Sequence, residues 1–283
     1  MSEVRQEHDA FGPVSIPANR YWGAQTQRAL EVFGRHGERF PAGLIHAFGL
    51  QKLASARANK RLGTLMEDLA LAIEQAAVQV AAGELDEHFP LTVWQTGSGT
   101  QTNMNANEVI ANRALELLGL ERGDYKRCHP NNHVNLSQST NDVYPTALRV
   151  AALSELGGLL EALETLRDAF DAKAFEFADV VKMGRTQLQD AVPMTLGQEF
   201  GTYAVTIGED RLRLAEADLL IHEINLGATA IGTGLNAPAG YAEAACRHLA
   251  EITGLPLITA VDLIEATQDV GAFVHLSGVL KRV

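Results

Sequence analysis

The sequence predicts a mainly α-helical protein in which long helices pack as a bundle. Along a long stretch after residue 142, apolar residues recur at spacings of three and four, as on the buried face of a bundle helix. These residues are Leu153, Leu156, Leu160, Leu163, Leu166 and Phe170. A second long apolar-periodic stretch covers residues 197–225, and strand signals are almost absent. We expect two domains, a mainly helical one over 1–138 and part of a helical bundle over 139–283.

The remaining elements follow from periodicity and from helix stop signals. Residues 1–40 lack clear periodicity and contain several glycines and prolines, so they predict an irregular arm. Gly83 and Gly119 stand where two helices are expected to stop. A polar loop is expected over 95–105, and a second polar segment over 128–142 introduces the first bundle helix. Further helices are predicted over 26–33, 42–61, 65–82, 108–118, 240–253 and 262–283.

Composition and charge exclude several classes of function. The 283 residues carry a net charge of −12 and no Lys/Arg cluster, which makes nucleic acid or an anionic membrane an unsuitable partner. The longest uncharged stretches are rich in Gly, Asn and Thr, which argues against a membrane-spanning helix. Cys128 and Cys246 lie in no CxxC arrangement, so we expect two reduced thiols. The first ten residues lack the apolar run of a signal peptide, and we expect a cytoplasmic protein. Neither a cofactor nor a metal is expected.

The polar loop over 95–105 has the chemistry of an anion site. Gly97 and Gly99 allow tight turns with exposed backbone N–H groups, while Ser98 and Thr100 add hydroxyl donors just before a helix. The spacing of a nucleotide-binding P-loop is absent. An ordinary glycine-rich turn is the alternative for this segment.

The second polar segment offers two kinds of site. His129 and His133 are four residues apart, which suits a metal on a helix, but the proline between them makes a helix improbable and disfavours metal binding. Further along, Ser139, Thr140 and Asn141 supply neutral donors at the start of the bundle helix, as carboxylate binding requires. Plain helix capping by these residues is the alternative.

A third polar segment interrupts the apolar pattern over residues 182–200. It contains Arg185, Thr186, Gln187, Gln189 and Asp190 and is closed by Pro193. Because unpaired buried polar groups are costly, polar residues between two apolar-periodic stretches are better explained as the wall of a site than as core. A loop kinked at the proline is the alternative. Three donor-rich segments at helix boundaries predict that they converge on one anion.

Together these segments resemble the signature segments of class II fumarases and aspartate ammonia-lyases. The resemblance rests on residues 96–105, 137–142, 184–200 and 225–236, and it extends over essentially the whole chain. It implies a homotetramer whose long helices form a central bundle, with each active site drawn from three subunits. It also implies a lyase that interconverts fumarate and a saturated four-carbon dicarboxylate by anti addition or elimination.

The resemblance assigns site roles by position. The substrate-binding residues would be Ser98, Thr100, Ser139, Thr140, Asn141, Thr186 and Gln187. Of these, Thr186 and Gln187 are also expected to be catalytic, while His129, Asn131 and Asn132 match the family's secondary dicarboxylate site. The family's flexible Gly-Ser-Ser-x-Met-Pro-x-Lys-x-Asn-Pro loop, which supplies the serine base, has no counterpart in the 283 residues. We therefore expect a chain cut within a helix and without substantial lyase activity alone. Turnover near that of an intact relative would refute this.

The leaving group divides the family, and the sequence mixes the two patterns. Residues 22–28 and 94–100 resemble fumarase, whereas 138–142 and 182–200 resemble aspartase. Fumarases carry His at the position of Gln187, where it can relay a proton to a poor leaving group. The nitrogen of aspartate leaves already protonated, so loss of the His harms a hydratase more, and we expect an aspartate ammonia-lyase. Fumarate hydratase is one alternative, and a non-catalytic oligomerising bundle is another.

Overall fold

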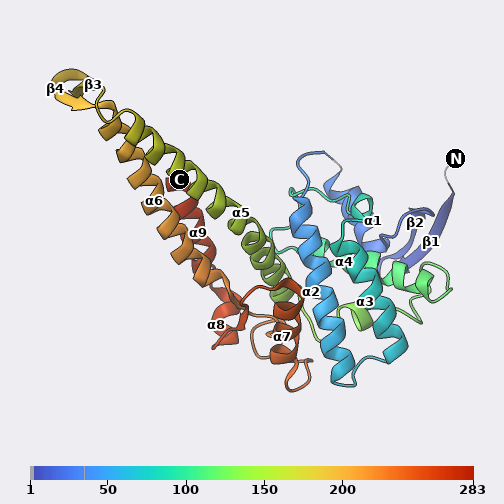
Figure 1. The fold of residues 1–283 in the computed structure, drawn as a ribbon. Coiled ribbons are helices and arrows are strands. Elements are labelled where there is room, and N and C mark those ends of the chain that lie inside the picture. The colour runs from blue at the N-terminus through green and yellow to red at the C-terminus, as the bar shows by residue number, and fades with distance from the viewer. Residues whose placement is uncertain (1–2, 35) are drawn as a thin grey trace. The chain divides into compact units, whose positions relative to one another are not determined.

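Helices make up most of the chain in a computed structural model, which describes residues 3–34 and 36–283 (Figure 1). The mainly α-helical class predicted from the sequence is confirmed. The described residues form two compact units, one with residues up to Ala151 and His222–Asp269, the other with Ala152–Ile221 and Val270–Val283. The predicted boundary at residue 138 stays a prediction. Among the described residues, no helix combines the length and apolar composition needed to cross a bilayer.

The first unit contains several helices in close contact. They are α1 (Ala24–Phe33), α2 (Ala42–Arg61), α3 (Glu67–Ala81), α4 (Thr100–Leu117), the start of α5 (Thr140–Glu176), α7 (Tyr241–Thr253) and α8 (Leu263–Gln268), with a 3₁₀ turn η1 (Asp86–His88) and a π-helical turn η2 (Pro130–Val134). Helix α2 packs against α3 and α7, and α3 packs against α4. At Gly49 a Cβ atom would lie 2.5 Å from the backbone N of Ala81, so α2 and α3 approach closely.

Helix boundaries in this unit mostly follow the sequence. The helix predicted over 42–61 is confirmed as α2. Gly83 and Gly119 follow the ends of α3 and α4 with φ of +77° and +73°, which confirms both stops. The loop expected over 95–105 is wrong in its second half. Gly99 adopts φ of +76° as the N-cap residue, and α4 starts immediately after it.

Strands are more numerous than the sequence predicted. Strands β1 (Val4–Asp9) and β2 (Gly12–Pro17) form an antiparallel hairpin where an irregular arm was expected, so that expectation is wrong. Val14 and Ile16 are buried between exposed residues, a period-two pattern over too few positions to stand out among the neighbouring glycines and prolines. A further sheet pairs β5 (Glu223–Ile224) in parallel with β6 (Ile258–Thr259).

The second unit contains the later part of α5, α6 (Leu196–Ile221) and α9 (Gly271–Arg282), with a hairpin between α5 and α6 (Figure 1). The ring of Phe170 on α5 lies 6.1 Å from that of Phe200 and 5.5 Å from that of Tyr203, both on α6. Helix α9 packs against α6. In the predicted seam Leu156 and Leu163 are buried, whereas Leu166 is 42% exposed.

The single helix expected over 262–283 is divided, so that expectation is wrong. Helix α8 ends at Gln268, Asp269 has an extended backbone with ψ of 134°, and α9 begins at Gly271. The Oδ1 atom of Asp262 caps α8 by accepting two backbone N–H groups. Asp269 and Val270 stand between the two helices, and Gly271 beside them was not taken as a break in the sequence prediction.

Candidate active site

The first turn of α5 gathers three neutral hydrogen-bonding side chains. The Oγ atom of Ser139 accepts the backbone N–H of Asn141 at 3.2 Å, so this serine does cap the helix. The Oγ1 atom of Thr140 accepts a hydrogen bond from Nδ2 of Asn103 at 3.0 Å. The Nδ2 atom of Asn141 donates to the carbonyl of Ala230 at 2.7 Å. Ser139 and Thr140 are half-buried and Asn141 is exposed, so capping and ligand binding are compatible here.

A buried carboxylate fixes this turn to a second segment, residues 225–236. The Oδ1 atom of Asp142 accepts the N–H of Ser139 at 2.9 Å. Its Oδ2 atom accepts the N–H groups of Gly227 at 3.0 Å and Thr229 at 2.9 Å. Burial raises the pKa of Asp142 to about 6, against the lowering effect of these N–H groups. The group is therefore ionised at neutral pH, and two segments far apart in sequence are held together by one side chain.

Helix α4 begins beside the first turn of α5 and brings a second set of donors. A Cβ atom on Gly99 would lie 2.1 Å from the ring of Tyr144 on α5, so the absence of a side chain permits this approach. The hydroxyl oxygens of Ser98 and Thr100 lie 3.2 Å apart, and both residues are exposed. The structure thus brings Ser98 and Thr100 together with the α5 turn. Two adjacent helix N-termini with neutral hydroxyls suit an anion.

The third polar segment forms an antiparallel hairpin in the second unit, β3 (Val181–Thr186) with β4 (Gln189–Thr195). Thr186 is the last residue of β3, and Gln187 and Leu188 make the turn with φ of +49° and +66°. Positive φ at both positions is typical of two-residue hairpin turns, but it normally selects Asn or Gly. The kinked loop held as the alternative is wrong. Thr186 and Gln187 are both exposed at the hairpin tip, and their place among the substrate-binding residues stays a prediction.

His129, Asn131 and Asn132 lie at turn η2, so the statement that a helix is improbable there is wrong. Pro130 takes the first position of this π-helical turn. A backbone N–H at that position would have no intrahelical acceptor, so the lack of one in proline costs nothing. The Nδ1 atom of His129 accepts the N–H of Asn131 at 3.0 Å and of Asn132 at 3.3 Å. Burial lowers the pKa of His129 and so favours the neutral ring. Because Nδ1 accepts these two N–H groups, the proton of the neutral ring is on Nε2.

His129 and Asn131 line a cavity of about 250 Å³. Its lining includes Gln25, Tyr125, His129 and Asn131, together with the carboxylates Asp9 and Glu108. Nδ1 of His133 accepts the N–H of His129 at 2.8 Å, so both imidazoles hold the turn through that atom. Over the described part of the chain, no three His, Cys, Asp or Glu side chains are grouped as metal ligands. The secondary dicarboxylate site stays a prediction.

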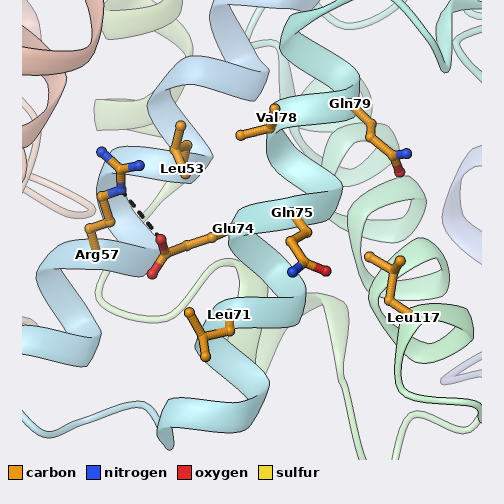
Figure 2. Close-up of a pocket in the computed structure, with 8 residues that line it drawn as sticks. All are labelled: Leu53, Arg57, Leu71, Glu74, Gln75, Val78, Gln79 and Leu117. Carbon is orange, nitrogen blue, oxygen red and sulfur yellow. Dashed lines mark hydrogen bonds and ion pairs between the residues drawn. The ribbon is translucent and has the colours of Figure 1, made fainter.

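A larger groove, of about 430 Å³, lies elsewhere on the first unit, against α2, α3 and α4 (Figure 2). It is lined by Leu53, Arg57, Leu71, Glu74, Gln75, Val78, Gln79 and Leu117. Its charged residues, Arg57 and Glu74, pair with each other at 3.3 Å. None of the predicted site residues lines it, and its cation is already neutralised, so its chemistry does not favour a dicarboxylate.

Sequence reasoning missed three buried polar residues that hold the donor turn: Lys52, Asn103 and Asp142. All are at most 1% exposed. Lys52 lies on α2, a helix of mostly buried residues, and a lysine in such a helix is a signal for a buried partner. Asp142 follows the donor residues directly and has the appearance of an ordinary capping residue. The signal for Asn103 was weaker, because the surrounding segment is rich in Asn and Thr.

Comparison with known proteins places this geometry in a family. A family model described as Lyase matches residues 12–283. The chain is 52% identical over 279 residues to fumarate hydratase class II of Ralstonia nicotianae and 53% identical over 286 residues to aspartate ammonia-lyase of Pseudomonas aeruginosa. These matches cover 98% and 100% of the chain but 60% of each relative. The chain thus spans about 60% of the length of these relatives.

Solved structures agree with the sequence matches. Fumarate lyase:delta crystallin from Brucella melitensis bound to cobalt gives a TM-score of 0.96 at 50% identity, covering 99% of this chain and 61% of that one. Class II fumarase from Schistosoma mansoni gives a TM-score of 0.93 at 36% identity, and the match covers 99% of this chain and 62% of that one. The predicted fumarase/aspartase-like fold is confirmed. The chain belongs to the lyase family that contains class II fumarate hydratases and aspartate ammonia-lyases.

Proposed function

We propose that the complete gene product forms fumarate by anti elimination from a four-carbon dicarboxylate, and that its substrate is L-aspartate. Removal of a proton from the carbon next to a carboxylate develops a second negative charge on that group, which aimed donors must stabilise. Ser98, Thr100 and the Ser139, Thr140 and Asn141 side chains supply neutral donors at two adjacent helix N-termini. We assign them to substrate binding, with Thr186 and Gln187 as the catalytic residues of the hairpin.

The choice of aspartate rests on Gln187. Its amide is exposed at the tip of the hairpin and does not titrate near neutral pH, so it cannot act as a general acid. Expulsion of hydroxide from malate calls for a proton donor, whereas the ammonium group of aspartate leaves with its proton already in place. An amide at this position therefore handicaps a hydratase more than an ammonia-lyase.

Fumarate hydratase is the second candidate. The relative from Ralstonia nicotianae carries that name at 52% identity, almost the value for the aspartate ammonia-lyase of Pseudomonas aeruginosa at 53%. Identity over the chain therefore does not separate the two reactions. The fumarase-like residues 22–28 favour this second candidate.

Fumarate formation from two substrates tests the proposal. The complete gene product is supplied with L-aspartate and L-malate in separate assays, and fumarate is followed by its ultraviolet absorbance. Fumarate from aspartate alone is the expected result. Fumarate from malate alone would make the protein a hydratase and refute the leaving-group argument, and fumarate from neither would leave the oligomerising bundle as the better account.

A secondary dicarboxylate site at His129, Asn131 and Asn132 belongs to the same proposal. The Nε2–H of His129 and the exposed amide of Asn131 offer donors beside the 250 Å³ cavity. Cys128 and Cys246 are both free and buried, which fits a reducing compartment, and we extend the proposal to the cytoplasm.

We further propose a homotetramer with active sites shared between subunits. The second unit leaves many large apolar side chains exposed on α5, α6 and α9, as interaction surfaces do. They include Phe175, Val205, Leu212, Leu219 and Val274, each more than half exposed. Light scattering on the complete gene product should give a tetramer mass, and Leu212→Glu should lower it. Leu71→Glu, at an exposed apolar residue of the first unit, is the control and should leave the mass unchanged. A wild-type monomer would contradict the proposal.

A further inference from the structure

A buried lysine lies beneath the first turn of α5, and it donates to two amide oxygens. The Nζ atom of Lys52, a fully buried residue, donates to Oδ1 of Asn135 at 2.8 Å and to Oε1 of Gln138 at 2.9 Å. An ammonium group is a donor only, so both amides must turn their oxygen toward it. Gln138 supports this orientation independently. Its Nε2 atom donates to the carbonyls of Val134 and Leu136, at 3.0 Å each.

The same oxygen of Asn135 meets a second amide, on α4. The Nδ2 atom of Asn103 lies 3.3 Å from Oδ1 of Asn135 and 3.0 Å from Oγ1 of Thr140. Because Asn135 presents an oxygen, Asn103 must present its NH2 group, and that group then also faces Thr140. The reverse orientation would place two oxygens together without a proton between them. The Oδ1 atom of Asn103 is buried without a partner, which is the cost of this orientation.

The orientation of Asn103 determines what Thr140 offers to a ligand. Since the Thr140 oxygen accepts from Asn103, its own O–H remains free to donate. Within residues 3–34 and 36–283 that hydroxyl has no other hydrogen-bond partner. The hydroxyl proton therefore has no acceptor among these described residues, and a ligand acceptor such as a carboxylate oxygen satisfies it.

We propose that Lys52, acting through Asn135 and Asn103, fixes the hydrogen-bond polarity of Thr140 so that this residue donates to a ligand carboxylate. The three are positioning residues, because they act through Thr140. The inference rests on the proposed function, which places Thr140 in the dicarboxylate site. It also accounts for a buried lysine where an apolar side chain would cost less, since an apolar residue would remove the donor that the Asn135 and Gln138 oxygens share.

Loss of the lysine's charge does not undo this arrangement. Burial lowers the pKa of Lys52 to about 7, and the nearby Asp142 carboxylate opposes the effect. A neutral amine still has two N–H bonds, one for each of its two amide contacts. Lys52 can therefore still donate to both amide oxygens above neutral pH.

A double-mutant cycle in the complete gene product tests the proposal. The probe is succinate, a saturated dicarboxylate without a leaving group, and its Kd is measured by calorimetry. Thr140→Val removes the hydroxyl and keeps its shape, while Lys52→Met removes the donor and keeps the length of the side chain. Each single change is expected to weaken binding about tenfold, the usual loss for a hydrogen bond to a charged group.

The double variant separates the proposal from a general structural role. If Lys52 acts through the Thr140 hydroxyl, the double variant binds succinate about tenfold more weakly than wild type, because the second change has nothing left to remove. A loss of about a hundredfold, the product of two independent effects, would overturn the proposal. Lys60→Met is the matched control on α2, since Lys60 pairs with Glu74 instead, and it should change the Kd by less than about twofold.

A second cycle covers the case in which Lys52→Met does not fold, as judged by circular dichroism. Asn103→Leu keeps the approximate shape and adds no charge, but it removes the NH2 group that holds the Thr140 oxygen in place. Its weakening of succinate binding should disappear in the Thr140→Val background, and persistence there would overturn the proposal. Wild-type protein that bound no succinate and formed no fumarate would overturn the proposed function, and this inference with it. Binding by wild type with additive losses would overturn this inference alone.

Discussion

Replacing Glu108 by Gln should remove one defined part of the pH dependence of unfolding. Glu108 of α4 is buried, and its carboxylate takes the place of an N-cap side chain for α1. It accepts the N–H groups of Gly23 and Gln25 at 2.8 Å each and of Thr26 at 3.1 Å. Burial raises the pKa of Glu108 to about 7, although these hydrogen bonds act in the opposite direction.

The size of the effect follows from linkage. A folded-state pKa above the unfolded value of 4.5 means that the folded protein holds this proton more tightly. The contribution to stability is therefore fully present below pH 4.5 and is lost as the pH rises through about 7. A shift of about 2.5 units, from 4.5 to about 7, corresponds to about 3 kcal/mol.

Urea titrations at several pH values between about 4.5 and 7.5 measure this contribution to the free energy of unfolding. Unfolding is monitored by the fluorescence of Trp22, which is buried. The free energy of unfolding of wild type minus that of Glu108→Gln should fall by about 3 kcal/mol over this range. Any constant cost of the amide cancels in the comparison across pH. A difference that stays level with pH would refute the reasoning.

Glu116→Gln is the matched control on the same helix. Burial acts to raise the pKa of Glu116, but hydrogen bonds from Tyr21, Arg122 and Arg113 outweigh it and lower the pKa to about 2. In the folded state this carboxylate is ionised throughout the range, so the same difference for Glu116→Gln should change by less than about 0.5 kcal/mol, and only near pH 4.5, where the unfolded group takes up a proton.

Removing the carboxylate in Asp142→Ala should speed hydrogen exchange at the N–H groups of Gly227 and Thr229 by about tenfold or more, measured by NMR, because both lose their acceptor; unchanged exchange would contradict this. Gly49→Ala should lower the free energy of unfolding in urea by more than about 2 kcal/mol, since its Cβ would lie 2.5 Å from the backbone of α3, and a loss under about 0.5 kcal/mol would show that the helices separate easily. Gln187→His should leave deamination of aspartate similar or faster in the fumarate assay. Gained dehydration of malate together with lost deamination would count against the proposed substrate.

Helices with a long run of periodic apolar residues, or with a glycine at their end, could be predicted from the sequence. Elements whose conformation depends on the rest of the fold could not. The helix over 42–61 has the apolar period of a helix and was located correctly. The hairpin of β3 and β4 was missed because its turn residues, Gln187 and Leu188, are not the Asn and Gly that positive φ favours. Such a backbone is held by the paired strands on either side, and a search for turn residues does not find it.

The candidate site divides in the same way. Hydroxyl and amide donors at helix starts are visible from residue type, so Ser98, Thr100 and Ser139 were identified locally. Lys52 was not, because its partners lie 83 and 86 positions further along the chain. What a buried lysine does depends on which acceptors the fold brings to it, and local sequence carries no record of that.

The arrangement of charge beneath the donor turn bears on how so acidic a chain would bind a dianion. The net charge is −12, so long-range attraction does not favour an anionic ligand. At the α5 turn the groups that reach the surface are neutral, while the two ionisable groups, Lys52 and Asp142, are both fully buried behind them. Each acts by orienting neutral groups: Asp142 holds backbone N–H groups, and Lys52 holds amide oxygens. Because oriented donors act at hydrogen-bond range, where the field of distant carboxylates is screened, selection of an acceptor ligand does not require a net positive surface.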